Sequence, residues 1–197
     1  MWNKAEKFLL KDKLIGPLVK KYGHCQIVPG KKGDYFVDLV DSITSQQLSG
    51  KAAKTIFERV KEKCGGNITP EKLRKLKTGQ LRGCGLSYAK CSYVKDLAQK
   101  VLEKKLETGK LDKLTDEEVM KELVAVKGIG NWTAEMFLMF TLARADIFPA
   151  DDLGIQNGMK KLLKRGPKPQ KIAVYANRWK PYRTVAAWYI WEALDNR

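Results

Sequence analysis

The sequence predicts an all-α protein, and three observations lead to this fold class. Apolar residues recur at the spacing of an amphipathic helix along almost the whole chain of 197 residues. Residues that end or start helices, such as Gly65-Gly66 and Thr69-Pro70, separate these segments. The sequence contains no alternation of apolar and polar residues long enough for a useful β-strand, and no internal repeat.

Each helix is placed by its capping residues and by its apolar spacing. Asp34 and Asp152 each precede an apolar periodic segment and can cap its first turn. Thr69 stands before a proline at the first helical position, and Thr115 stands before acids that suit the helix dipole. The segment 132–143 is nearly all apolar and is therefore expected to be buried. The expected helical segments are 5–23, 35–47, 48–66, one from 70, 87–109, 115–126, 132–143, 153–166, 169–179 and 181–194.

The composition indicates a polyanionic partner. The formal net charge is +16 and the isoelectric point is about 9.7, which is far beyond what solubility requires. Nucleic acid is the usual polyanion for such a chain, although an anionic membrane attracts the same charge. The N-terminus lacks the apolar core of a signal peptide, and the longest apolar stretch is too short to span a bilayer. We therefore expect an intracellular protein, in the cytoplasm and nucleoid of a prokaryote or in the nucleus of a eukaryote.

Cysteine and histidine usage argues against a metal centre or a disulfide framework. The four cysteines, at positions 25, 64, 84 and 91, form no CxxC pair. They are expected to be reduced thiols. His24 is the only histidine, so a histidine-dependent triad or zinc site is not expected.

The stretch Val126–Glu135, "VKGIGNWTAE", places Gly-Ile-Gly between two apolar helices. Glycines there allow a tight reversal and leave the N–H groups of the next helix accessible to a phosphate. Lys127 adds a positive charge beside the turn. For a bare Gly-x-Gly, a tight helical hairpin that binds nothing is the better interpretation, so the flanking residues have to decide.

Those flanking residues resemble a known family. "LVAVKGIGNWTA" is similar to the helix-hairpin-helix of the DNA glycosylase superfamily named for this hairpin and a Gly/Pro-rich loop followed by aspartate (HhH-GPD), and "DIFPADDLGIQNG" is similar to its loop. "SITSQQLSGKAAKTIF", "LRGCGLSYAKCSYVKDLA" and "YANRWKPYRTVAAWYIW" resemble further blocks of its 3-methyladenine DNA glycosylase II subfamily. The blocks occur in the same order and cover about residues 34–191, whereas the first thirty or so residues match nothing.

The resemblance implies a catalytic carboxylate, which matches the chemistry. Breaking an N-glycosidic bond makes the sugar carbon oxocarbenium-like, and a fixed carboxylate stabilises that charge and can orient the attacking water. Asp152 is the candidate, although it could serve only as a helix cap, and the adjacent Asp151 is its rival. Bifunctional members carry a lysine nucleophile where this chain has Trp132. We therefore expect a monofunctional enzyme without abasic-site lyase activity.

The base pocket is expected to be aromatic. Trp132 and Trp191 can hold a cationic alkylated purine against their faces, or they can be core residues, as Trp188 is expected to be. Met136 is expected to line the pocket at a position where close relatives have a tyrosine. Asp151 is expected to line the same pocket.

The target base must leave the duplex, so a wedge is expected to fill the gap. The resemblance places the wedge at Gln47 or Leu48, although Gln46 and Gln47 could only cap helix ends. The residues expected to contact DNA are Gln47, Leu48, Ser49, Lys127, Gly128, Ile129, Gly130, Asn131 and Thr133.

The family hairpin often binds K⁺ or Na⁺ through main-chain carbonyls, which the resemblance places at Val124, Val126 and Ile129. The iron–sulfur cluster of some members needs four closely spaced C-terminal cysteines, and this sequence does not have them. No other cofactor is expected.

The expected architecture has two helical lobes with DNA over the cleft between them. Residues 37–147 would form a central bundle with the wedge and hairpin, and 1–36 with 148–197 would form the second lobe, so that Asp152 and Trp132 face each other. The expected function is excision of alkylated purines, 3-methyladenine and 7-methylguanine, from double-stranded DNA by a monomer. Two alternatives stay open: a DNA-binding module without chemistry, and a glycosylase for an oxidised or mismatched base.

Overall fold

The computed structural model describes residues 1–30, 33, 35–164 and 169–195, and all regular structure in this part of the chain is helical. The all-α prediction is therefore confirmed. The chain divides into two compact units, of which unit 1 comprises Met1–Pro29 with Glu135–Arg197 and unit 2 comprises Gly30–Ala134. The boundary falls inside one helix, α9 (Asn131–Met136).

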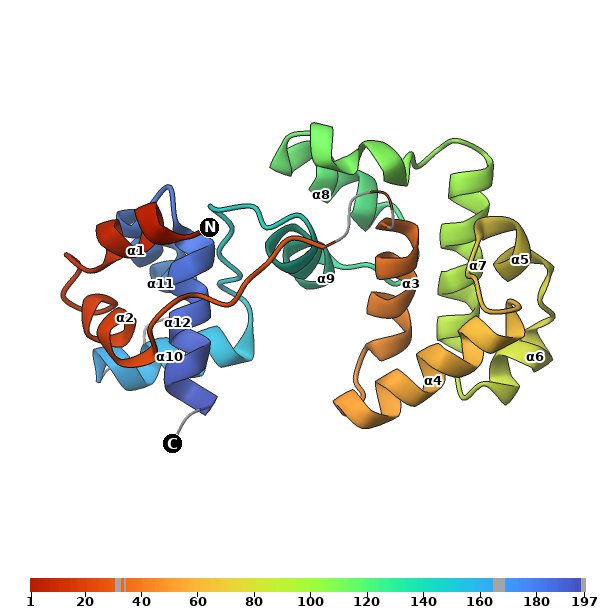
Figure 1. Cartoon of the computed structure of the whole chain (residues 1–197), viewed down its shortest axis with the longest axis horizontal. Coiled ribbons are helices and arrows are strands. Elements are labelled where there is room, and N and C mark those ends of the chain that lie inside the picture. The colour runs from red at the N-terminus through yellow and green to blue at the C-terminus, as the bar shows by residue number, and fades with distance from the viewer. Residues whose placement is uncertain (31–32, 34, 165–168, 196–197) are drawn as a thin grey trace. The chain divides into compact units, whose positions relative to one another are not determined.

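Unit 1 is built around the C-terminal helix. Its helices are α1 (Asn3–Leu9), α2 (Gly16–Tyr22), α10 (Leu153–Leu163), α11 (Pro169–Ala176) and α12 (Arg183–Asp195), with a π-helical turn at Phe137–Thr141 and a 3₁₀ turn at Asn177–Trp179. Helix α12 packs against α1, α2 and α10 (Figure 1). Its buried Tyr189 joins Trp179 and Leu9, all fully buried, in a single apolar core.

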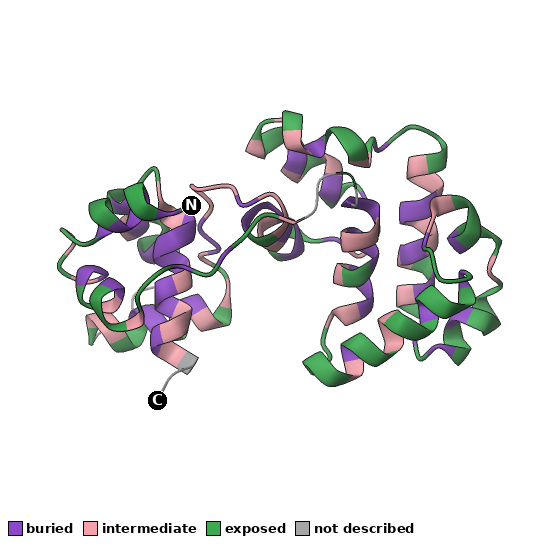
Figure 2. Cartoon of the chain, in the orientation of Figure 1, coloured by how far each residue is buried: buried purple, intermediate pink, exposed green. Residues whose placement is uncertain are grey.

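Unit 2 is built around α7. Its helices are α3 (Tyr35–Ser45), α4 (Gly50–Lys63), α5 (Pro70–Lys75), α6 (Thr78–Gly83), α7 (Tyr88–Leu102) and α8 (Asp116–Val124), with a 3₁₀ turn at Thr108–Lys113. Helix α7 packs against α3, α5 and α6, and α3 also packs against α4. Figure 2 shows that the buried faces of these helices point toward each other and the exposed faces toward solvent, as amphipathic helices require.

The caps at Thr69, Thr115 and Asp152 are confirmed, because each side chain accepts a hydrogen bond from an N–H group of the following first turn. The cap expected at Asp34 lies outside the described residues.

The single helix predicted over 5–23 is wrong, because α1 and α2 are separate helices. Between them the Asp12 Oδ1 atom accepts hydrogen bonds from the N–H groups of Leu14 (2.8 Å) and Ile15 (2.9 Å), which replaces helical bonding. Pro17 then stands in the first turn of α2. The segment 87–109 also divides, since α7 ends at Leu102.

The predicted lobe boundaries at 37 and 147 also differ from the boundaries of the two units. Residues 135–147 belong to unit 1, because Met139 and Ala143 are buried in the same apolar core as Leu9 and Trp179. Trp188 packs, partly buried, against this core, as the sequence predicts.

Candidate active site and DNA interface

Asp152 lies at the N-terminus of α10, and one of its carboxylate oxygens accepts two hydrogen bonds. Its Oδ1 atom accepts hydrogen bonds from the main-chain N–H of Ile155 (2.8 Å) and from the indole Nε1–H of Trp191 on α12 (2.9 Å). The first bond is the helix cap, and the second joins the carboxylate to a different element. Because both bonds restrict its rotation, the partly buried carboxylate is held in one orientation.

The loop that leads to Asp152 is fastened to the start of α12. The buried Thr184 hydroxyl donates to the Arg144 carbonyl (2.6 Å) and accepts from the Ile147 N–H (3.0 Å). The Arg183 guanidinium donates to both carboxylate oxygens of Asp146, at 2.7 and 3.1 Å. This paired geometry is the most directional that arginine offers. The loop before Asp152 is therefore anchored to α12, the helix that also carries Trp191.

Gly154 leaves the room that the contact between Asp152 and Trp191 requires. A Cβ atom at this position would lie 2.9 Å from Asp152 Oδ1 and 2.9 Å from both Cδ1 and Nε1 of Trp191. Carbon atoms do not pack at such distances without displacing something. Glycine at this position therefore permits the close approach of the indole to the helix N-terminus.

Glu135 is a carboxyl group of the same unit that the sequence analysis missed. It lies on α9, partly buried, in an otherwise apolar stretch. Burial raises its pKa from 4.5 to about 7, and the negative charges of Asp151 and Asp152 add to the rise. The detectable signal in the sequence is a single acid within a helix that is otherwise expected to be buried.

An aromatic surface flanks the carboxylate. The rings of Trp191 and Phe140 lie with centroids 5.9 Å apart and planes inclined by 32°. Phe140, which sequence reasoning did not select, is 42% exposed, and Met136 packs partly buried against the core of unit 1. Asp151 is exposed beside Asp152. The structure thus joins Asp152 to Trp191, and Asp151 and Met136 belong to the same unit.

In unit 2, the glycine turn (residues 127–130) packs against α7. Gly128 has φ of +81°, and a Cβ atom there would lie 2.1 Å from the ring of Tyr93. The Lys127 N–H donates to the Asp96 carboxylate (2.9 Å), which also pairs with Lys100 at 3.5 Å. Only glycine fits at position 128, both for its backbone conformation and for the space above the ring.

The turn that carries the predicted wedge is bonded to the glycine turn. The Gln46 side-chain amide donates to the Gly128 carbonyl (2.8 Å). The Lys90 ammonium donates to the carbonyls of Thr44 (2.8 Å) and Gln46 (2.6 Å), and burial lowers its pKa. Gln46 therefore has a structural role, whereas Gln47, with φ of +57°, and Leu48, 39% exposed, are presented to solvent, as is Ser49.

Two of the residues predicted to contact DNA have buried side chains. The side chains of Ile129 and Thr133 are buried, at 3% and 8% exposed, because they pack beneath the glycine turn and the first turn of α9. They can offer only main-chain groups to a ligand. Lys127, Gly130 and Asn131 are exposed, and Trp132 is 49% exposed.

Comparison with known proteins identifies the family. Residues 40–184 match the model of the HhH-GPD superfamily base excision DNA repair protein, which is more than half of the chain. The chain belongs to the HhH-GPD superfamily. The glycine turn and Asp152 both lie within the matched residues.

The relatives of this HhH-GPD protein support the predicted subfamily. It is 34% identical to the alkylbase DNA glycosidase-like protein mag2 of Schizosaccharomyces pombe, over 97% of this chain and 93% of the relative. It is 38% identical to DNA-3-methyladenine glycosylase 1 of the same yeast, over 82% and 73% of the two chains.

Solved structures agree with this family assignment. The yeast 3-methyladenine DNA glycosylase Mag1, in complex with abasic DNA, aligns with a TM-score of 0.82 at 34% identity, covering 96% of each chain. DNA-3-methyladenine glycosidase of Bacillus halodurans aligns with a TM-score of 0.86 at 36% identity, covering 98% of this chain and 89% of that one.

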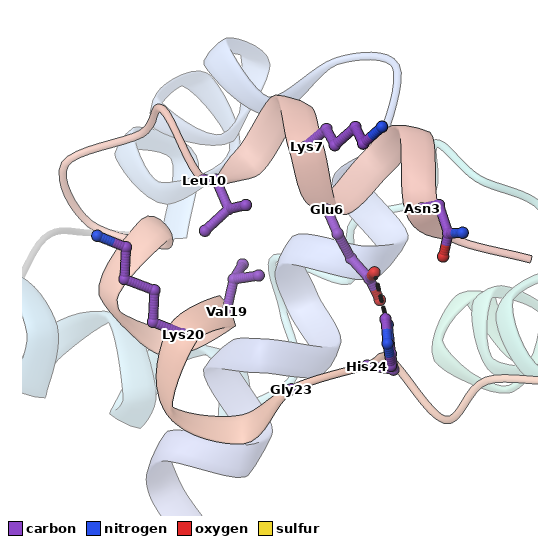
Figure 3. Close-up of a pocket in the computed structure, with 8 residues that line it drawn as sticks. All are labelled: Asn3, Glu6, Lys7, Leu10, Val19, Lys20, Gly23 and His24. Carbon is purple, nitrogen blue, oxygen red and sulfur yellow. Dashed lines mark hydrogen bonds and ion pairs between the residues drawn. The ribbon is translucent and has the colours of Figure 1, made fainter.

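Unit 1 also contains a pocket next to α1 and α2. Figure 3 shows this pocket, in which His24 Nδ1 contacts the Glu6 carboxylate at 2.9 Å.

All four cysteines are free and buried. The described ranges contain no group of three or more His, Cys, Asp and Glu side chains able to hold a metal ion. Among the same residues, none of the helices combines the length and the apolar character needed to cross a bilayer.

Proposed function

We propose that this HhH-GPD protein hydrolyses the N-glycosidic bond of alkylated purines, such as 3-methyladenine and 7-methylguanine, in double-stranded DNA. The observation that carries the proposal is the Asp152 carboxylate, fixed by the Ile155 N–H and the Trp191 indole. The names of the relatives support this substrate class, since one is called DNA-3-methyladenine glycosylase 1 and one solved structure is called a 3-methyladenine DNA glycosylase.

The carboxylate acts on the positive charge that develops on the sugar. As the bond from C1′ to the base breaks, C1′ becomes oxocarbenium-like, and a carboxylate already held in place stabilises this charge without reorganising. Asp152 can also orient water and accept its proton as the water adds to C1′. The products are the free base and an abasic site.

The chain acts by water attack rather than by a covalent amine. The position where bifunctional members carry a lysine holds Trp132, whose indole cannot form a Schiff base. Abasic-site lyase activity is therefore not part of the proposal.

Alkylated purines suit an aromatic site because they are cationic while attached to DNA. The mutually tilted rings of Trp191 and Phe140 offer π faces near the carboxylate, and the exposed Trp132 is proposed as a further wall. Such faces favour cations by roughly 0.5–2 kcal/mol. The base must first be flipped out, and the exposed Gln47 or Leu48 is proposed to fill its place.

The hairpin is proposed to hold a DNA phosphate. Its exposed residues Gly130 and Asn131 open helix α9, where free N–H groups and the dipole favour an anion, and Lys127 adds charge. A K⁺ or Na⁺ ion would fit beside it through the carbonyls of Val124, Val126 and Ile129. The Val126 oxygen already accepts the Ile129 N–H at 3.1 Å, and a carbonyl has a second lone pair for a cation.

Base release from methylated duplex DNA tests the proposal, comparing the wild type with Asp152→Asn at equal DNA occupancy. Asparagine keeps an oxygen for the cap and for the Trp191 N–H but removes the charge. We expect release of 3-methyladenine and 7-methylguanine to fall at least about a hundredfold while DNA binding is retained.

Asp151→Asn serves as the matched control, because Asp151 is the exposed neighbour. Loss of release in Asp151→Asn alone would transfer the role to Asp151. Binding without release by the wild type would instead favour a non-catalytic DNA-binding module or a different lesion.

A further inference from the structure

One face of α7 supports the two turns of unit 2 that are proposed to meet DNA. Lys90, Tyr93 and Asp96 follow one another on α7 at intervals of three residues, so their side chains lie on the same side of the helix. Lys90 bonds the turn that carries the predicted wedge (the wedge turn, residues 45–49). Tyr93 packs against the glycine turn, and Asp96 accepts a hydrogen bond from it. A single helix therefore sets the places of both turns.

Lys90 is partly buried and directs its ammonium at the end of α3. The Nζ atom donates to the carbonyl of the fully buried Thr44 (2.8 Å) and to the carbonyl of Gln46 (2.6 Å). The last carbonyls of a helix have no donor within the helix, and a positive charge is favoured beside them. Lys90 therefore caps α3 and fixes the peptide group that stands immediately before Gln47.

Gln47 needs this support because of its backbone conformation. Its φ of +57° lies in the left-handed region, which residues other than glycine, asparagine and aspartate rarely adopt. Such a conformation persists where the surrounding contacts determine it. These contacts come from both sides, because Lys90 bonds residue 46 and the Leu48 N–H donates to the Ser45 carbonyl (3.2 Å). The chain itself therefore holds the wedge turn in one shape.

Gln46 joins the wedge turn to the glycine turn directly. Its side-chain amide donates to the Gly128 carbonyl (2.8 Å), across 82 positions of the sequence. Its own carbonyl accepts from Lys90, so this residue is bonded both to α7 and to the glycine turn. The glycine turn is in turn bonded to α7 through the Lys127 N–H and the Asp96 carboxylate. The two turns and α7 thus form a closed ring of contacts, which restricts the movement of either turn alone.

We propose that Lys90 and Gln46 are positioning residues, which hold the wedge at a fixed place relative to the glycine turn. The exposed side chains of Gln47 and Leu48 then enter the base stack without first having to be ordered, because folding has already ordered the turn that carries them. The proposal rests on the proposed function, because it assumes that the wedge takes the place of a base that leaves the duplex.

Loss of either side chain should separate two quantities that a purely structural role would change together. DNA affinity depends mainly on phosphate contacts, whereas insertion of the wedge depends on the shape of its turn. Lys90→Met removes the ammonium but keeps a long unbranched side chain, and Gln46→Met removes the amide. We expect both variants to bind duplex DNA with a Kd within about threefold of the wild type.

Fluorescence of 2-aminopurine measures wedge insertion separately from chemistry. The probe is a duplex with 2-aminopurine beside a tetrahydrofuran analogue of an abasic site, and its emission rises when the neighbouring bases unstack. At saturating protein, Lys90→Met and Gln46→Met should give less than about half of the wild-type rise and release 7-methylguanine about ten- to a hundredfold more slowly in a single turnover. Lys90→Arg, whose guanidinium can still donate to both carbonyls, should restore most of the rise and of the rate.

Lys75→Met is the control, because it removes the same charge from an exposed lysine of α5. It should match the wild type in fluorescence and in release. Circular dichroism checks that each variant is folded, and Gln46→Met, which leaves the cap of α3 in place, carries the test if Lys90→Met does not fold.

Four results would overturn the positioning role: wild-type fluorescence and release in both methionine variants, a loss of DNA affinity in proportion to the loss of release, no recovery in Lys90→Arg, or no fluorescence rise with the wild type at full occupancy. A rise with the wild type that is lost in the methionine variants, without 7-methylguanine release by any of them, would support the positioning role and contradict the proposed function instead.

Discussion

Replacing Glu135 by glutamine should change how stability depends on pH. The pKa of Glu135 in the folded chain is about 7, above the ordinary 4.5, so between these pH values the folded state keeps a proton that the unfolded state has lost. The free energy of unfolding therefore falls as pH rises through this window. Each pKa unit corresponds to about 1.4 kcal/mol, which gives a total of about 3 kcal/mol. Glutamine does not titrate, so the variant escapes this loss.

Urea unfolding followed by tryptophan fluorescence measures this change in stability mainly in unit 1, the unit that contains Glu135. Trp2, Trp179, Trp188 and Trp191 lie in unit 1 with Glu135, whereas only Trp132 lies in unit 2. The advantage of Glu135→Gln over the wild type should grow by about 3 kcal/mol between about pH 4.5 and pH 8. With a urea slope of about 2 kcal/mol per molar, the midpoints then separate by about 1.5 M more at the higher pH.

Other carboxyl groups titrate in both proteins and cancel in this comparison. The exposed Glu117→Gln variant is the control for the change in charge. If the advantage of Glu135→Gln over the wild type is the same at both pH values, the Glu135 carboxyl is not held in a protonated state, and the inference from its burial is wrong.

Two further outcomes are expected. Gly128→Ala should destabilise unit 2 by more than about 2 kcal/mol in thermal unfolding followed by circular dichroism, because its Cβ atom would lie 2.1 Å from the Tyr93 ring at a φ of +81°. Gly109→Ala, which meets no atom within 4 Å, should change stability by less than about 0.5 kcal/mol, and equal effects would contradict the argument. The buried cysteines, including Cys25 with its pKa raised by burial to about 12, should react with a thiol reagent only after urea is added. Rapid labelling of the folded protein would show that this burial is incorrect.

Local signals in the sequence were sufficient for much of the fold. Thr69, Thr115 and Asp152 cap helices as predicted, because a cap depends on a side chain and the N–H groups two or three residues later. The break between α1 and α2 was missed because apolar spacing continues through it. There, the Asp12 side chain competes with the helix for main-chain N–H groups, which the spacing does not reveal.

The site was only partly predictable for a different reason. Asp152 was found because a loop pattern precedes it, but its bond to Trp191 joins residues that only the packing of α12 against α10 brings together. The raised pKa of Glu135 could not be predicted for the same reason, because it depends on burial and on two acids sixteen and seventeen positions away in the chain. The placement of Trp132 opposite Asp152 stays a prediction.

The hydrogen bond from Gln46 to the Gly128 carbonyl has a practical consequence for protein engineering. The turn at positions 47–49 is an obvious segment to exchange between relatives when a different wedge is wanted. Because residue 46 is bonded across the unit to the hairpin, a graft that replaces only the exposed positions keeps its support. A graft that begins one residue earlier disconnects the turn from the hairpin, so position 46 belongs to the scaffold and should remain glutamine.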